Sequence, residues 1–214
     1  MKAIPAIKIL VWLFALTPAV ILALSAYHVL WAPDPHWDLG PNPAERLQHD
    51  TGDWAINFLM ASLAITPLRK LTKFAPLIRF RRLLGLFAFF YAVLHFITYI
   101  WFDKQFDLAE MWKDVYKRPF ITVGFAALMM LSSLAITSTA GWIRRLGGKR
   151  WQWLHRLIYV AALCAVIHYY WLVKSDVSAP LTYGAIWTVL MLARLPSIFS
   201  RKDVHKPKPT AVST

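Results

Sequence analysis

Six apolar runs divide the chain, and shorter polar segments separate them. They cover roughly residues 9–30, 54–68, 83–102, 120–137, 153–173 and 181–196. About 20 apolar residues in a helix cross the ~30 Å hydrocarbon core of a bilayer, and the first run is longer than a signal-peptide core. We therefore expect an all-α, polytopic membrane bundle. It would be a single domain over 1–214, with six transmembrane helices and a tail at 197–214.

Composition supports a membrane protein. The chain is 58% hydrophobic and 16% charged, with a mean hydropathy of +0.46, whereas a soluble domain is about half apolar and a quarter charged. The net charge of +13 lies beside apolar runs, which favours a membrane surface over nucleic acid. The single cysteine, Cys164, excludes an intramolecular disulfide and a cysteine-based zinc or iron–sulfur site. We expect it to be a small core residue.

Loop charges predict the orientation. The segments before the third and fifth runs are basic and lack acids, whereas the alternate loops are mixed or acidic. By the positive-inside rule, both termini are cytoplasmic, and so is the tail 197–214. The basic residues of the two loops are Arg69, Lys70, Lys73, Arg79, Arg81 and Arg82, and Arg144, Arg145, Lys149 and Arg150.

Three histidines lie within apolar runs, where ionisable or metal-ligating side chains indicate function. His95 lies ~12 Å from the outer end of the third run, and His168 lies ~9 Å from the outer end of the fifth, at 1.5 Å per residue. Because both runs rise from the inside to the outside, the two histidines share a level. An iron between the helices could take one imidazole from each, as in haem-binding bundles.

His155 is harder to place. It precedes His168 by about 20 Å along an ideal helix and differs from it by about 140° around the axis. Either the two histidines serve different neighbours, or the helix is kinked between them. The third run offers no histidine at the inner level, so a second haem on His155 would need another ligand, a water or an open position.

A few other polar residues are candidates for a supporting role. Arginine pairs well with carboxylates such as haem propionates, so Arg82 and Arg156 could serve an inner site, and Lys117 and Arg118 an outer one. Their alternative role is to anchor the helices at the membrane surface. His49 is a further candidate, because it lies where the second run re-enters the membrane.

The intramembrane histidines have two alternative explanations besides haem binding. Intramembrane histidines can join helices by hydrogen bonds. Zinc is disfavoured because a tetrahedral site needs more ligands than the outer level supplies. The sequence contains no G-x-G-x-x-G or P-loop motif. Electrons would therefore come from a membrane-soluble donor or another protein.

Several motifs together resemble the MsrQ (YedZ) family, within the ferric-reductase-like transmembrane group, over roughly residues 48–195. The matching pieces are LIRFRRLLGL at 77–86, LH at 94–95, Tyr99, RPF at 118–120, GKRW at 148–151, LH at 154–155, Tyr159, HY at 168–169 and Trp171.

The resemblance implies a function. Such proteins are haem b subunits of the bacterial inner membrane that carry electrons from the quinone pool to a periplasmic molybdenum-dependent methionine-sulfoxide reductase. That MsrP-like partner forms a heterodimer with them and repairs oxidised periplasmic proteins. The family's haem-associated histidines correspond to His95, His155 and His168, although broader relatives usually carry two ligands on the third span and this chain has only His95. The resemblance also implies FMN and allows a cytoplasmic flavin reductase as a donor.

Two other functions stay open. One is a stand-alone transmembrane ferric or metal reductase fed by a separate flavin reductase. The other is a non-redox membrane scaffold whose histidines are structural. The absorbance spectrum of the purified protein separates the scaffold from the redox functions, because only the latter require a Soret band.

Overall fold

The computed structural model describes residues 3–32, 34–37 and 39–194, and every regular element in these ranges is helical. The predicted all-α class is therefore confirmed. The predicted tail at 197–214 and the last residues of the sixth run lie outside the described residues. The α-helices are α1 Ala3–Trp31, α2 Pro43–Thr72, α3 Ile78–Thr98, α4 Leu108–Lys117, α5 Pro119–Ile136, α6 Ala140–Leu154, α7 Leu157–Leu172 and α8 Ser178–Leu192. Short 3-10 turns η1 Pro35–Trp37 and η2 Ala75–Leu77 and a π-helical turn η3 Tyr99–Asp103 complete the order.

Three helical segments among the described residues are long and apolar enough to cross a membrane. They are Pro5–Trp31, Ala75–Asp103 and Pro119–Ile136, and two shorter apolar helices are Leu157–Leu172 and Ser178–Leu192. Each of the six predicted runs has a helix, but the second was predicted too short. Asn42 caps α2 by accepting from the Glu45 amide, with Pro43 at the first helical position, so the helix starts well before the apolar run.

Two helices were not predicted, and one of them corrects the fifth run. Neither α4 nor α6 is an apolar run, because one face of each is polar and exposed. The fifth run was expected to be one helix over 153–173, but α6 extends to Leu154, the chain turns at His155, and α7 begins at Leu157. A further break lies within α6 at Gly147, whose φ of 71° suits glycine.

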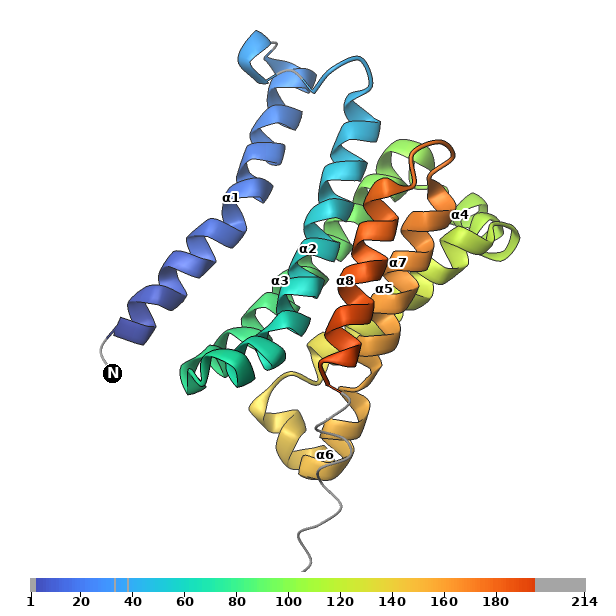
Figure 1. Cartoon of the computed structure of the whole chain (residues 1–214). Helices are drawn as coiled ribbons and strands as arrows, with labels where there is room; N and C mark the ends of the chain where they lie inside the picture. Colours follow the sequence, from blue (N-terminus) through green and yellow to red (C-terminus); the bar gives the residue numbers. More distant parts are fainter. Residues whose placement is uncertain (1–2, 33, 38, 195–214) are drawn as a thin grey trace, which may run out of the picture.

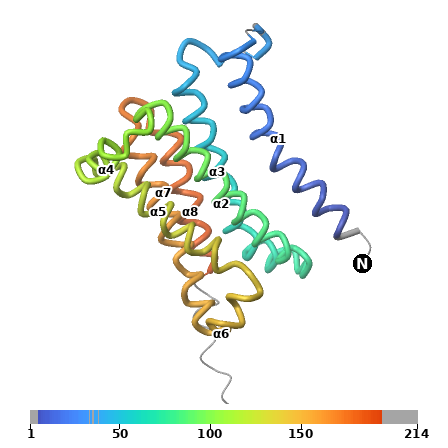
Figure 2. The backbone as a smooth tube through the Cα atoms, turned by 180° about the vertical axis from the view of Figure 1, so that it is seen from behind, coloured from blue at the N-terminus to red at the C-terminus, as the bar shows by residue number. Residues whose placement is uncertain are grey.

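The helices pair in a way that leaves a central space. Figure 1 and the reverse view in Figure 2 show α2 along α3 and α5 along α7, with α8 on α7 and α1 standing to one side. The core joins α2, α3, α5 and α7 through residues such as Leu59, Leu63, Ala88, Leu131 and Ala161. Four helices thus surround one interior, in which the candidate site lies.

Two prolines lie inside helices, and side chains from elsewhere in the bundle bond the backbone near them. Pro67 has no N–H, so it cannot bond the carbonyl of Leu63 within α2. That carbonyl instead accepts from buried Arg194, just after α8. Beside Pro18 in α1, the fully buried Tyr91 hydroxyl donates to the Ala15 carbonyl at 2.7 Å and accepts from the Ala19 amide at 3.0 Å. Both contacts tie a peripheral helix to the core.

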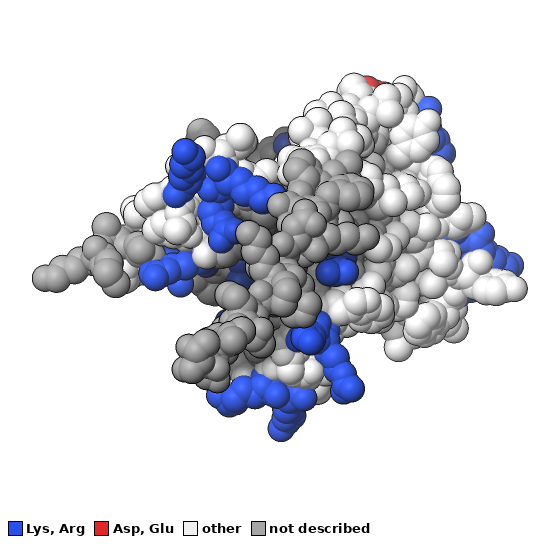
Figure 3. Space-filling model, turned by 60° about the horizontal axis from the view of Figure 1, so that its bottom comes forward, with Lys and Arg blue, Asp and Glu red and all other residues white. Residues whose placement is uncertain are grey.

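Basic side chains gather at one end of the bundle. The α2–α3 connection and α6 lie at the lower end in Figure 1, and Figure 3 shows many Lys and Arg side chains on that face. We call this the basic end. The cytoplasmic side was predicted from these same basic residues, so the orientation stays a prediction.

Candidate functional site

A cavity of about 390 Å³ lies between α2, α3, α5 and α7, and its charged lining residues lie toward the end opposite the basic end, which we call its mouth. This volume falls in the range of roughly 300–1,000 Å³ that is typical of cofactor sites. Its interior is mostly apolar, with Ile56, Leu59, Ala92, Phe125, Leu128 and Leu131 among the lining residues. Glu45, His49, Asp53, Asp103 and Arg118 bring charged or titratable side chains to it, and His95 and His168 line it as well.

His95, near the end of α3, is held by α2. Its Nδ1 lies 2.8 Å from the carbonyl oxygen of Gln48. Four residues later on the same helix, Gly52 faces the ring, and a β-carbon added there would lie 3.1 Å from both Cε1 and Nδ1 of His95. The close approach of the two helices at this level therefore depends on glycine.

His168, near the end of α7, is held in the same way by α5. Its Nδ1 lies 2.7 Å from the carbonyl oxygen of Phe120. Gly124 follows four residues later, and an added β-carbon would lie 2.6 Å from the Nδ1 of His168. Each histidine thus contacts the same arrangement on its neighbouring helix: a backbone carbonyl and, one helical turn further on, a glycine.

These hydrogen bonds determine which nitrogen of each ring keeps a lone pair that could bind a metal. A carbonyl oxygen only accepts, so Nδ1 carries the proton and Nε2 keeps its lone pair in the neutral ring. The two ring centroids lie 6.1 Å apart with planes at 80°. The structure therefore brings together the two histidines that the sequence placed at one level.

The geometry fits an iron between the rings. Two metal–nitrogen bonds of about 2 Å, each extended by about 1 Å to the ring centre, give about 6 Å between the centroids of opposed imidazoles. A backbone carbonyl on the far nitrogen is one of the common partners of a metal-bound histidine, besides a carboxylate or a water. The observed 6.1 Å, the two glycine contacts and the apolar cavity all suit a haem. In the described part of the chain, no group of three or more His, Cys, Asp or Glu residues could hold a metal ion.

His155 is separate from this pair. It caps α6, stacks on Trp151 with ring centroids 3.9 Å apart, and places Nε2 3.4 Å from the Ser138 hydroxyl. Its Nδ1 lies 3.1 Å from the Trp151 carbonyl. The break between α6 and α7 answers the question left by the helical spacing, because His155 and His168 serve different neighbours across a turn.

The other predicted residues are dispersed. His49 lines the cavity and lies 3.9 Å from Glu45, one turn away on α2. Arg82 and Arg156 are exposed and are not among the residues that line the cavity. Cys164 is half-buried in α7. Sequence reasoning missed Gly52 and Gly124, although a glycine one turn after each contacting carbonyl was visible in the sequence.

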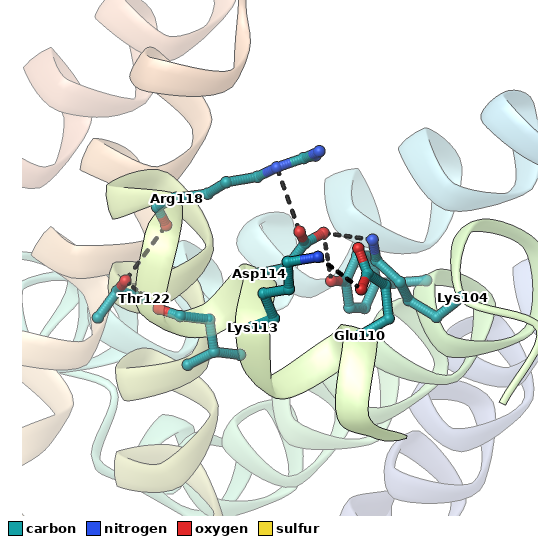
Figure 4. A network of polar contacts seen from close by, with 8 residues as sticks. Lys104, Glu110, Lys113, Asp114, Arg118 and Thr122 are labelled. Carbon is teal, nitrogen blue, oxygen red and sulfur yellow. Dashed lines mark hydrogen bonds and ion pairs between the residues drawn. The ribbon is translucent and has the colours of Figure 1, made fainter. Parts of the chain in front are cut away.

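A network of polar contacts around Asp114 (Figure 4) adjoins the cavity, because two of its members, Tyr99 and Arg118, line it. The Asp114 carboxylate pairs with the Lys104 ammonium, accepts from the Tyr99 hydroxyl at 3.2 Å, and lies 3.4 Å from Nε of Arg118. Burial raises the pKa of Asp114, but the hydrogen bond and charge of Lys104, the charge of Arg118 and the Tyr99 bond outweigh it and lower the pKa overall. The network links α4 to η3 and to Arg118, which lines the cavity.

Comparisons with known proteins show the family of the chain. Residues 51–166 match the family described as ferric reductase like transmembrane component. A protein of Herminiimonas arsenicoxydans, named protein-methionine-sulfoxide reductase heme-binding subunit MsrQ, is 58% identical over 159 residues, 73% of each chain. Relatives with the same name occur in Ralstonia nicotianae, at 46% identity over 91% of this chain and 87% of the relative, and in Caulobacter vibrioides, at 44% identity over 87% and 85%. The chain therefore belongs to the MsrQ family, within the ferric-reductase-like transmembrane group.

Proposed function

We propose that the chain is a haem b electron-transfer subunit that accepts electrons from the respiratory quinone pool and passes them to a periplasmic methionine-sulfoxide reductase. One observation carries the proposal. His95 and His168 line the same cavity with ring centroids 6.1 Å apart, and each has its Nδ1 held by a carbonyl from a neighbouring helix. The relatives are named as heme-binding subunits of this reductase system.

The chain's own residues prepare the site before any ligand arrives. Gln48 and Phe120 fix the tautomer and rotation of the two imidazoles. Because the rings are already oriented, little further ordering is needed on binding. The chemistry that bound haem supplies is reversible one-electron oxidation and reduction of its iron. The apolar lining between the four helices excludes water and favours a low dielectric, a property that tunes redox potential.

The route requires a donor and an acceptor of matched stoichiometry. A quinol releases two electrons and two protons as it becomes a quinone. Reduction of a sulfoxide to a thioether and water consumes two electrons and two protons, and this chemistry belongs to a molybdenum-dependent partner that forms a heterodimer with the chain. In this proposal the chain spans the bacterial inner membrane six times with both termini in the cytoplasm. The position of the basic end supports that orientation.

FMN, a cytoplasmic flavin reductase and a second haem are the remaining expected components. FMN and a cytoplasmic flavin reductase rest on the resemblance alone. A second haem at His155 would need another ligand, since His155 contacts Trp151 and Ser138. The proposal thus assigns one haem, to the pair His95 and His168.

The test uses the purified chain in lipid nanodiscs. Adding a soluble quinol should reduce the haem and shift the Soret band, and adding the oxidised partner should reoxidise it at a rate that depends on partner concentration. Reduction of ferric chelates without any need for a partner would favour the stand-alone metal reductase. If the purified chain shows no Soret band, the remaining hypothesis is a non-redox membrane scaffold with structural histidines.

A further inference from the structure

Arg118 is the one lysine or arginine among the residues that line the cavity in the described structure. The carboxylic acids that line the cavity are Glu45, Asp53 and Asp103. An anion that enters a largely apolar cavity needs a cationic partner, because an unpaired buried charge is costly. Any carboxylate held here would therefore be driven toward Arg118 and away from the acidic side chains.

The guanidinium of Arg118 has N–H donors that could bind a further acceptor. Arginine carries five N–H donors in a planar fork. Only Nε is engaged in the described structure, 3.4 Å from Oδ1 of Asp114. Figure 4 shows the terminal nitrogens of Arg118 extending past the Asp114 carboxylate. The two terminal nitrogens can thus donate a pair of hydrogen bonds to a second carboxylate.

The backbone fixes where this guanidinium begins. Arg118 ends α4 and precedes α5, and Pro119 restricts it to an extended conformation, with φ −111° and ψ 102°. Its amide donates to the Asp114 carbonyl at 2.9 Å, and its own carbonyl accepts from the Thr122 amide at 3.1 Å. The Thr122 hydroxyl also bonds the Val115 carbonyl at 2.5 Å across the corner. The corner is therefore rigid.

Asp114 then fixes the side chain. Its carboxylate is itself held by Lys104 and by Tyr99, both from the segment that follows His95. The Asp114 and Lys104 side chains are only 7% and 9% exposed, whereas the Arg118 side chain is 55% exposed. Two buried partners thus hold one accessible cation that lines the cavity.

We infer that Arg118 is a carboxylate-binding residue that anchors a propionate of the tetrapyrrole held between His95 and His168, with Asp114 as its positioning residue. The inference rests on the proposed haem function and adds the residue that orients the ring. The two histidines alone leave the ring free to rotate about the axis that joins them. A single cation at the mouth selects the orientation in which a propionate points outward.

The experiment compares haem b with its dimethyl ester, which lacks propionate charge. Apo-protein in neutral-lipid nanodiscs is titrated with each compound, and the dissociation constant is read from the Soret band. Arg118→Gln should weaken haem b binding about 10- to 100-fold, as expected for loss of a charged hydrogen-bonded pair, and should change ester binding by less than about threefold. Arg118→Lys should recover part of the loss, because it restores the charge without the fork.

Lys117→Gln is the matched control, since it removes the neighbouring positive charge outside the cavity lining. It should change haem b binding by less than about twofold, as expected for an exposed charge. Asp114→Asn should weaken haem b more than the ester. Ester binding by Arg118→Gln itself reports that the variant folds.

Equal losses of haem b and ester in Arg118→Gln would overturn the inference, because they would indicate a purely structural role. Unchanged haem b affinity in that variant, or an equal loss in Lys117→Gln, would overturn it too. Failure of the wild-type chain to bind either compound would instead refute the proposed haem function.

Discussion

Gly124 lies so close to the imidazole of His168 that a β-carbon on it would be 2.6 Å from Nδ1, less than any ordinary contact. The same relationship joins Gly52 to His95 at 3.1 Å. In each case the glycine lies one turn after the carbonyl that binds the histidine. The two imidazoles are therefore positioned by backbone rather than by side chains.

The first prediction concerns Gly124→Ala. The methyl group must push the His168 ring away from its carbonyl, so haem affinity should fall about 10- to 100-fold, the size of an overpacking penalty. Gly52→Ala should have a smaller effect, because its added carbon would lie 3.1 Å from the His95 ring instead of 2.6 Å from the His168 ring. Haem content per protein, from absorbance after purification, measures both.

The control for these variants is Gly184→Ala, where the added carbon would meet Val166 at an ordinary 3.6 Å. It should leave haem content within about twofold of the wild type, since no neighbour must move. Equal haem content in all three alanine variants would refute the role of the glycines.

A second prediction concerns how α1 is held. Tyr91→Phe removes the hydroxyl that bonds Ala15 and Ala19 in α1. The loss should destabilise the docking of α1 by roughly 1–2 kcal/mol, the size of interhelical hydrogen bonds in membranes. Faster protease cleavage of the connection between α1 and α2 would show it. The matched control is Tyr183→Phe, whose bond to Asn57 is exposed and away from α1; cleavage should stay at the wild-type rate there.

A third prediction concerns pH. The pKa of Asp114 is lowered in the folded protein, so its contribution to stability is present above the unfolded pKa of about 3.9 and is lost as pH falls through the lower folded value. At pH 7 Asp114→Asn should therefore melt at a lower temperature than the wild type. The gap should narrow once the pH falls below about 4.

Glu110→Gln serves as the control for Asp114, because Glu110 pairs with Lys113 on the exposed face of the same helix. Exposed pairs contribute about 0–1 kcal/mol, so this variant should melt close to the wild type at every pH. A constant gap between Asp114→Asn and the wild type from pH 7 to pH 3 would contradict the assignment of a lowered pKa.

Much of the site was predictable from the sequence, and the rest depended on helix rotation. The distances of His95 and His168 from the loop charges placed them at one level, because rise per residue is nearly constant along a helix. Which carbonyl each ring contacts depends on how α2 and α5 rotate against α3 and α7, and local sequence does not determine that rotation. Gly52 and Gly124 were visible, but their partners were not.

The fold, too, was predictable from the sequence only in part. Apolar runs predicted a helix at each of six positions. A break in the helix between His155 and His168 was one of two alternatives that the spacing left open, but its place at His155 was not predicted, since Trp153 and Leu154 continue the apolar run up to it. The amphipathic α4 was also missed, because its polar face interrupts hydropathy. Its Asp114 became recognisable as a buried group only once Lys104 and Tyr99 were seen to surround it.

The most direct test of the account is the haem content of the purified chain and of three single variants, His95→Ala, His168→Ala and His155→Ala. The account predicts a Soret band and dithionite-reduced b-type bands in the wild type, their loss in the first two variants, and their retention in the third, because His95 and His168 line the cavity and His155 does not. Full haem content in His95→Ala or His168→Ala, or its loss in His155→Ala alone, would contradict it.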